Sequence, residues 1–283
     1  MSLTFRPLSH ALGAEIQGVD LGKPLSNSEF DQIHSKFLES GILLFRDQKI
    51  TREQHIAFSR RFGELDRHDS LPRDRHPDYP ELLLVTNIPE KDGKESASKY
   101  TGQQWHSDMS FTLEPSLGSL LRGITIPPVG GDTMFTNMYM AYDTLSDGMK
   151  KMIEPLHGVH TGRRKVTDRD TEREREQTRI NPPIAQPLVR VHPETGRKAL
   201  YIGEKVSGLV GMTEEESKPI IDYLVRHATR PQFVYRHQWR QDDILLWDNR
   251  CTMHIALGDY AEGEIRHLER TTVKGTPSGY YLQ

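Results

Sequence analysis

Residues 244–254 read ILLWDNRCTMH, an apolar run followed by a polar turn and a second apolar segment that ends at His254. An apolar run of this length, bounded by a turn signal, is consistent with a buried β-strand. The chain then turns back into apolar sequence and places a histidine beside a core strand. His254 lies 146 residues after Asp108 in the chain, and only a fold that returns on itself, such as a two-sheet jelly roll, would bring the two side chains together.

Further short β-type segments lie between the middle of the chain and its end. The segment 192–197, HPETGR, separates two of them and predicts a hairpin turn. Many short strands with turn signals between them predict a mainly β sandwich or barrel with flanking helices. The expected strands are 117–126, 187–191, 198–202, 232–235, 244–247 and 268–273.

The helices are marked by their start signals. Ser26, Thr51 and Thr213 are each followed three residues later by Glu or Gln, which is the pattern of a capping box. Apolar residues at helical spacing follow each of them. Two apolar runs near the first two helices, 42–45 and 82–85, predict buried strands.

The composition is typical of a folded globular protein, with 283 residues, 27% charged and 35% hydrophobic. We expect one domain spanning 1–283, because β barrels and sandwiches of this size are often undivided. The net charge of −3 argues against a general nucleic-acid binder. No apolar run is long enough to span a membrane, and the first residues lack a secretory signal pattern. We therefore expect a cytoplasmic protein, with its one cysteine, Cys251, as a small buried side chain.

One segment stands apart by its charge. Residues 163–179 read RRKVTDRDTEREREQTR, where acidic and basic side chains nearly cancel. Such mixed charge predicts a solvated loop or exposed helix, and a mobile lid is one form that it can take.

Two His-x-Asp pairs are candidates for a metal site, His76 with Asp78 and His106 with Asp108. On a strand, residues i and i+2 point to the same side, so such a pair supplies two ligands readily. By chance, a chain of this composition is expected to contain about 0.9 such pairs. The spacing alone is therefore not evidence of a metal site, and the neighbouring residues must distinguish the two pairs. His76 lies among prolines and charges, which indicate an exposed turn, whereas His106 follows Trp105 in more apolar sequence. Weaker competitors are His192 with Glu194 and His267 with Glu269.

A third ligand and two anion-binding side chains come from the second half of the chain. His254 would complete a set of two histidines and one carboxylate, which is typical of iron(II) oxygenases, although a lone histidine beside a core strand is often structural. Arg266 and Arg270 would face one side of a strand, and buried arginines require anions. The alternative is a pair of exposed arginines that bind nearby glutamates, which are Glu264 and Glu269.

These motifs together resemble the taurine dioxygenase / 2,4-dichlorophenoxyacetate dioxygenase family of iron(II)- and 2-oxoglutarate-dependent oxygenases. The resemblance extends over nearly the whole chain. Each motif is weak alone, but their order is specific. In chain order they are WHSD at 105–108, GGDT at 130–133, WDNR at 247–250, His254, and Arg266 with Arg270.

The resemblance implies a double-stranded β-helix, that is, a jelly-roll core, and an enzyme that uses Fe(II), 2-oxoglutarate and O2. It implies His106, Asp108 and His254 as the metal ligands. It also implies Thr133 and Arg266 as contacts of the 2-oxoglutarate carboxylate. The substrate positions that it implies are His68, Met109 and Arg270, although which of the two arginines binds which carboxylate stays open.

Two departures bear on the substrate. Leu71 stands where the taurine enzyme has a tyrosine, and Gly102 where it has an asparagine. Both changes remove polar groups that would hold a sulfonate and an amine. We therefore expect hydroxylation of a small organic anion, in the first place an aryloxyalkanoate or similar carboxylate.

Two other functions are weighed beside this one. One is a dioxygenase for taurine or an alkyl sulfonate, and the other is a non-catalytic jelly-roll binding protein, since a fold does not determine a function. The expected partner is a small anionic molecule, and the chain is a possible homo-oligomer. Neither a nucleic acid nor a membrane is expected as a partner.

Overall fold

A computed structural model describes residues 3–69, 71, 74–89, 93, 96, 102–162 and 181–282. The charged segment 163–179, predicted as a solvated loop or lid, lies outside the described residues. None of the helices in the described part of the chain is long and apolar enough to cross a membrane.

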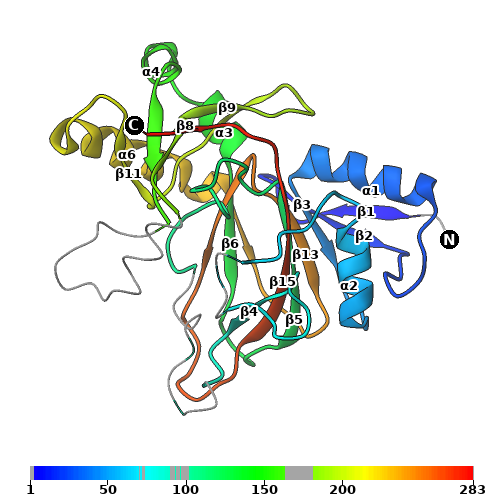
Figure 1. The fold of residues 1–283 in the computed structure, drawn as a ribbon. Coiled ribbons are helices and arrows are strands. Elements are labelled where there is room, and N and C mark those ends of the chain that lie inside the picture. The colour runs from blue at the N-terminus through cyan, green and yellow to red at the C-terminus, as the bar shows by residue number, and fades with distance from the viewer. Residues whose placement is uncertain are drawn as a thin grey trace.

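A large sheet runs through the centre of the molecule (Figure 1), in the order β1-β2-β3-β13-β5-β15-β4. Its neighbours pair antiparallel except β2 and β3, which are parallel. The strands are β1 (Thr4–Pro7), β2 (Ala14–Gln17), β3 (Ile42–Phe45), β4 (Leu83–Thr86), β5 (Gly118–Thr125), β13 (Ile244–Asp248) and β15 (His267–Val273).

Three smaller sheets complete the β structure, in the orders β12-β6-β14, β11-β7-β8-β16 and β10-β9. Their strands are β6 (Thr133–Asn137), β7 (His157–His160), β8 (Ile184–Pro187), β9 (Val189–Val191), β10 (Lys198–Leu200), β11 (Val206–Leu209), β12 (Val234–His237), β14 (Thr252–Ala256) and β16 (Tyr280–Tyr281). The predicted mainly β fold with flanking helices is therefore confirmed.

The two faces of the large sheet serve two separate cores, because side chains alternate along a strand. On β13, Leu245 and Trp247 point toward the β12-β6-β14 sheet, where Trp247 packs against Phe135 at 5.4 Å between ring centroids. Ile244 and Leu246 point the other way, toward two helices. The strand is thus buried on both faces, which explains why its sequence is a continuous apolar run.

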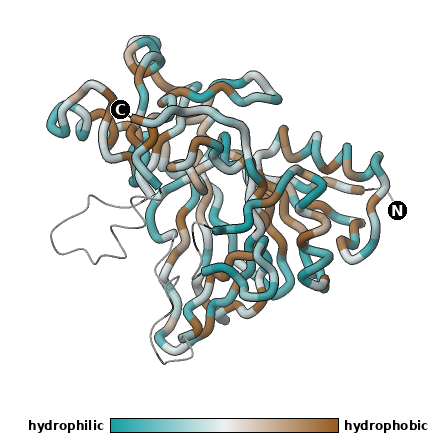
Figure 2. The backbone as a smooth tube through the Cα atoms, in the orientation of Figure 1, coloured by the Kyte–Doolittle hydropathy of each residue, from teal (hydrophilic) through white to brown (hydrophobic). Residues whose placement is uncertain are grey.

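Helices cover the outer faces. The helix α1 (Asn27–Ser40) buries Ile33 and Phe37 against the large sheet, and α2 (Arg52–Ser59) packs beside it. Hydrophobic and hydrophilic positions alternate along α1 in Figure 2, as expected for a helix with one buried face. All three predicted capping boxes are present. The remaining helices are α3 (Met138–Asp143), α4 (Asp147–Ile153), α6 (Glu214–Ala228) and the 3-10 helix η1 (Pro231–Phe233).

Several predicted boundaries were wrong. The expected strand 187–191 is two strands, β8 and β9, which belong to different sheets. The segment 232–235 starts in η1 and becomes a strand only at Val234. The hairpin predicted at 192–197 is confirmed, since β9 and β10 pair antiparallel on either side of it.

Candidate metal and anion site

Two candidate ligands are joined by the backbone. His106 and His254 form an isolated antiparallel bridge, in which each amide donates to the other's carbonyl oxygen at 3.0 and 2.8 Å. His254 lies on β14. His106, in contrast, is a single bridge residue, and a turn at Asp108 follows it. The assumption that His106 and Asp108 lie together on a strand was therefore wrong. The Ser107 hydroxyl donates to the Thr252 carbonyl at 2.8 Å and fastens this turn to the start of β14.

The large sheet positions the carboxylate. The Asp108 amide donates to the Asn249 side chain at 3.0 Å, and the Ser119 hydroxyl donates to Asp108 Oδ2 at 2.7 Å. Ser119 lies on β5, and Asn249 follows β13 directly, with its Oδ1 also accepting from the Trp247 indole. The residues after the quoted apolar run thus orient the candidate ligand Asp108.

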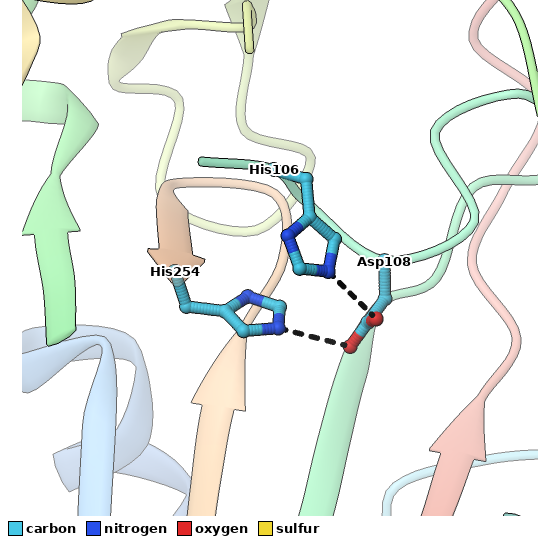
Figure 3. Close-up of side chains that lie close together, drawn as sticks. All are labelled: His106, Asp108 and His254. Atoms are coloured by element: carbon cyan, nitrogen blue, oxygen red, sulfur yellow. Dashed lines mark ion pairs between the residues drawn. The ribbon is translucent and has the colours of Figure 1, made fainter. Parts of the chain in front are cut away.

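The three side chains converge, His254 from β14 and His106 and Asp108 from the segment bridged to it (Figure 3). The Nε2 atoms of His106 and His254 lie 3.8 and 3.9 Å from the two Asp108 carboxylate oxygens. One ligand atom of each side chain lies within 4.8 Å of the others. All three residues are buried, with exposed fractions of 4 to 6%, and Phe135 and Trp247 pack against the His254 ring.

The electrostatics put these groups in the protonation states that a metal requires. Burial is the main cause that lowers the pKa of His254 to about 4 and the pKa of His106 well below its usual value. Burial acts in the opposite direction on Asp108, but the Arg270 guanidinium, the two histidines and the Ser119 hydroxyl together outweigh it and hold the pKa of the carboxyl below its usual range. Neutral imidazoles and an ionised carboxylate are the forms that bind metal ions.

The donor set fits a divalent transition metal. None of the hydrogen bonds among the described residues includes the Nε2 atom of His106 or of His254, and both atoms face the Asp108 carboxylate. The His106 Nδ1 lies 2.7 Å from the Gln104 carbonyl oxygen, and a proton on that nitrogen leaves Nε2 unprotonated. Two histidines and one carboxylate on one side of a metal are the set used for non-haem Fe(II).

The two arginines are buried, and the predicted alternative of exposed arginines was wrong. Arg270 Nη1 lies 2.5 Å from Asp108 Oδ1, and its Nε has no hydrogen-bond partner in the described part of the chain. The predicted glutamate partners are elsewhere: Glu269 binds Arg52, and the Glu264 carbonyl accepts from the Asn87 side chain.

Arg266 lies beside Thr133, as the resemblance implies. Its Nε donates to the Gly131 carbonyl at 2.8 Å, and its Nη2 lies 3.4 Å from the Thr133 hydroxyl. Burial lowers the pKa of Arg266 to about 10, and none of the ion pairs among the described residues includes it. A Cβ at Gly131 would lie 3.1 Å from Arg266 Cδ, so only glycine allows this close approach. Arg266 is thus a buried cation with hydrogen bonds but without a paired carboxylate.

His68 and Met109 both have a left-handed backbone, with φ values of 53° and 52°. Non-glycine residues in this region are uncommon and cluster at functional sites. The His68 ring is fully buried, and neither nitrogen has a hydrogen-bond partner in the described part of the chain. Burial, assisted by Arg270, lowers the pKa of His68 to about 4. His68 is therefore a neutral side chain whose charge state depends on the same arginine that pairs with Asp108.

The two departures from the taurine enzyme also lie at the site. A Cβ at Gly102 would lie 3.5 Å from the His106 ring, so a side chain there would reach the candidate metal ligands. Gly102 has a φ of 81°, which disfavours any other residue. Leu71 follows His68 in a turn, where its amide donates to the His68 carbonyl at 2.9 Å.

The rejected candidates lie away from this cluster. His76 lies in a turn, as predicted, but its side chain is buried rather than exposed and accepts from the amides of Asp78 and Tyr79. His192 follows β9 at the hairpin, where Nε2 lies 3.0 Å from Asp248 Oδ2. His267 Nε2 lies 3.8 Å from Glu269, whose carboxylate binds an arginine.

The sequence analysis missed three residues of the site. Asn249 was noted only as part of a motif, and Ser119 gave no signal because a serine inside an apolar strand is common. Lys205 was also missed: it is partly buried, and its charge acts on His106, His254 and Asp108. Only the packing of a turn against Trp105 reveals it.

Comparison with known sequences points to one family. Residues 4–272 match the family described as taurine catabolism dioxygenase TauD, TfdA family. The alpha-ketoglutarate-dependent 2,4-dichlorophenoxyacetate dioxygenase of Cupriavidus pinatubonensis is 34% identical over 90% of this chain and 92% of its own. The (S)-phenoxypropionate/alpha-ketoglutarate-dioxygenase of Sphingobium herbicidovorans is 34% identical over 88% of each chain.

Comparison with solved structures agrees. The crystal structure of AAD-2 in complex with Mn(II) and N-oxalylglycine matches with a TM-score of 0.85 and 34% identity, and all of both chains is covered. At this identity and coverage the likeness extends beyond the fold. The chain therefore belongs to the TauD/TfdA family of 2-oxoglutarate-dependent dioxygenases, with the jelly-roll core of that family.

Proposed function

We propose that this enzyme uses Fe(II), 2-oxoglutarate and O2 to hydroxylate a small organic anion, in the first place an aryloxyalkanoate. One oxygen atom goes into a substrate C–H bond, and the other goes into succinate as 2-oxoglutarate loses CO2. Hydroxylation of a carbon that bears an ether oxygen gives a hemiacetal, which then loses the aryl alcohol. We also propose that residues 1–283 act as one domain.

The observation that carries this proposal is the convergence of three buried ligand side chains, two of which have an Nε2 atom without a hydrogen bond among the described residues. His106, Asp108 and His254 would hold the metal, and Ser119 and Asn249 would keep the carboxylate in place. Bound Fe(II) would supply the oxygen activation and the C–H cleavage. The protein would position the reactants and shield them from water.

Arg266 and Thr133 would bind the far carboxylate of 2-oxoglutarate. A guanidinium fork suits a carboxylate, and the cost of a buried cation is offset when an anion arrives. The Thr133 hydroxyl accepts from the Trp239 indole at 2.9 Å, which leaves its proton free to donate to the carboxylate.

His68, Met109 and Arg270 would surround the substrate. The free Nε of Arg270 and the unpartnered His68 ring can both meet an acid group, and Met109 offers an apolar wall. The absence of a polar side chain at Leu71 and Gly102 favours an apolar body over the amine of taurine. The two relatives described above, whose names specify phenoxy acids, support this choice.

The test is succinate release under air with Fe(II) and 2-oxoglutarate, with a panel of acids. Phenoxyacetate or 2-phenoxypropionate should stimulate succinate formation more than taurine does, with release of phenol. Faster turnover with taurine or an alkyl sulfonate would contradict the proposed substrate and support the sulfonate alternative. If none of the panel gives oxygen-dependent succinate, the non-catalytic alternative gains support.

A further inference from the structure

A turn between β10 and β11 is fastened to the strand-like segment that carries His106. The Glu204 amide donates to the Trp105 carbonyl at 2.9 Å, and the Trp105 amide donates to Glu204 Oε2 at 3.0 Å. A Cβ at Gly203 would lie 2.8 Å from the Trp105 carbonyl, so the backbones approach too closely for any larger residue. The turn is thus held against the residue that precedes the first candidate metal ligand.

This attachment places Lys205 beside the site. Its charge acts on His106 and His254, and it interacts with both Asp108 and Arg270. The neighbouring Glu204 carboxylate already accepts from Trp105. None of the ion pairs or hydrogen bonds within the described ranges includes the Lys205 ammonium group.

Lys205 is therefore a partly buried cation in excess of the local negative charge. The one carboxylate of the cluster, Asp108, is already paired with Arg270. Burial lowers the pKa of Lys205, and Arg270 adds to this effect while Asp108 opposes it. A cation removed from water without a counterion costs free energy, and an anionic ligand removes that cost.

We propose that Lys205 binds the acid group of the primary substrate and thereby sets the preference for anions over neutral molecules. This inference rests on the proposed function and deepens it. The far carboxylate of 2-oxoglutarate has its own candidate partner in Arg266, which contacts Gly131 and Thr133 and not the turn that carries Lys205. Lys205 is therefore assigned to the substrate rather than to the co-substrate.

The test compares Lys205→Met with the wild type on a matched pair of ligands, phenoxyacetate and its neutral amide. The variant should raise the KM for the acid about tenfold while the KM for 2-oxoglutarate stays within twofold. The ratio of the KM for the amide to the KM for the acid should fall by a similar factor. Lys205→Arg should restore much of this ratio, because it keeps the charge.

Lys218→Met is the matched control, since Lys218 is exposed on α6 and pairs with Asp222 at 2.7 Å. This variant should leave the KM values for the acid, the amide and 2-oxoglutarate unchanged. An unaltered acid-to-amide ratio in Lys205→Met would overturn the inference, and so would a rise in the KM for 2-oxoglutarate alone. Thermal unfolding of both variants separates a local effect from a loss of fold.

Binding measurements distinguish the failure of this inference from that of the proposed function. Calorimetric titration of the acid into oxygen-free enzyme with Fe(II) and 2-oxoglutarate should show tighter binding to the wild type than to Lys205→Met. That result without any succinate formation would sustain Lys205 as an anion site and contradict the proposed reaction. No binding of any acid of the panel to the wild type would overturn the Lys205 assignment as well.

Discussion

Two buried clusters among the described residues have side chains of the kinds that bind metals. One is His106, Asp108 and His254, and the other is His192, Asp248 and Cys251; in each, the possible ligand atoms lie within 4.8 Å of one another. Proximity and burial therefore do not distinguish them. The difference lies in what the lone pairs and protons of each group already do.

In the second cluster every strong donor and acceptor is in use. His192 Nδ1 accepts from two backbone amides, so its Nε2 bears the proton and donates to Asp248 at 3.0 Å. Both Asp248 oxygens accept from Arg250, at 2.8 and 2.6 Å. Burial raises the pKa of the Cys251 thiol well above its usual value, as expected for the small buried side chain that was predicted. A metal there would have to break these bonds, whereas the Nε2 atoms of the first cluster are free.

The largest expected effect is on the first cluster. His106→Ala, Asp108→Ala and His254→Ala should each lower Fe(II) affinity and turnover more than about 100-fold, since even outer partners of metal ligands cost 10- to 100-fold. Fe(II) titration and succinate release measure these losses, and circular dichroism should show an intact fold. His76→Ala is the control and should keep full activity. Near-normal iron affinity in His254→Ala would show that His254 is not a metal ligand.

The second cluster should respond in stability instead. Asp248→Ala leaves the buried Arg250 with Glu194 as its remaining carboxylate, and removal of one partner of a buried pair costs about 3–5 kcal/mol. Urea unfolding of the metal-free protein should show this decrease in the free energy of unfolding. Iron affinity of the folded variant should change by no more than a few fold. Loss of iron stoichiometry with unchanged stability would reverse the assignment of the two clusters.

The same contrast separates two buried arginines. Arg250 has carboxylate partners within the chain, whereas Arg266 has a carbonyl and a hydroxyl as its nearest oxygen partners among the described residues. Arg266→Ala should raise the KM for 2-oxoglutarate about thirtyfold, which corresponds to the lower end of the 2–5 kcal/mol expected for a buried charge pair. The KM for the primary substrate should change much less. A steady-state titration of each reactant at saturating levels of the other measures both, and an unchanged value for 2-oxoglutarate would place Arg266 elsewhere.

The smallest expected effect concerns pH and unpartnered histidines. Neither ring nitrogen of the buried His160 has a partner in the described part of the chain, and burial, with Arg190, lowers its pKa to about 3. Between that value and 6.5 the unfolded chain binds the proton and the folded protein does not, so stability falls as pH falls. This one group should cost roughly 1–2 kcal/mol between pH 7 and pH 5. Urea unfolding of metal-free His160→Phe should show a shallower pH dependence, and an equal slope would contradict the assignment.

The order of motifs along the chain predicted the family and the metal ligands, because metal binding requires particular residue types. His106, Asp108 and His254 were predicted as a set, and the structure brings them together. Thr133 lies beside Arg266, as the resemblance implies, whereas the pairing of Arg270 with Asp108 was not predicted. The apolar run 244–247 was correctly interpreted as a buried strand.

Other properties followed only from packing. His76 has the same spacing to an aspartate as His106, yet it lies in a different turn, and its burial was not visible in its polar surroundings. Ser119, Asn249 and Lys205 act through contacts between segments far apart in sequence. No local pattern distinguishes such a serine, asparagine or lysine from an ordinary one.

The sequence by itself determined the ligand types, the buried strand at 244–247 and the starts of three helices, since these depend on residue chemistry and short-range patterns. Only the tertiary structure decided which of two similar clusters keeps free lone pairs. That outcome depends on which backbone amides and arginines reach His192 and Asp248, and on the bridge that sets His106 against His254. The amides of Glu194 and Thr195 and the guanidinium of Arg250 are near neighbours in sequence, whereas the His192–Asp248 hydrogen bond and the His106–His254 bridge join distant segments that short-range patterns do not place together.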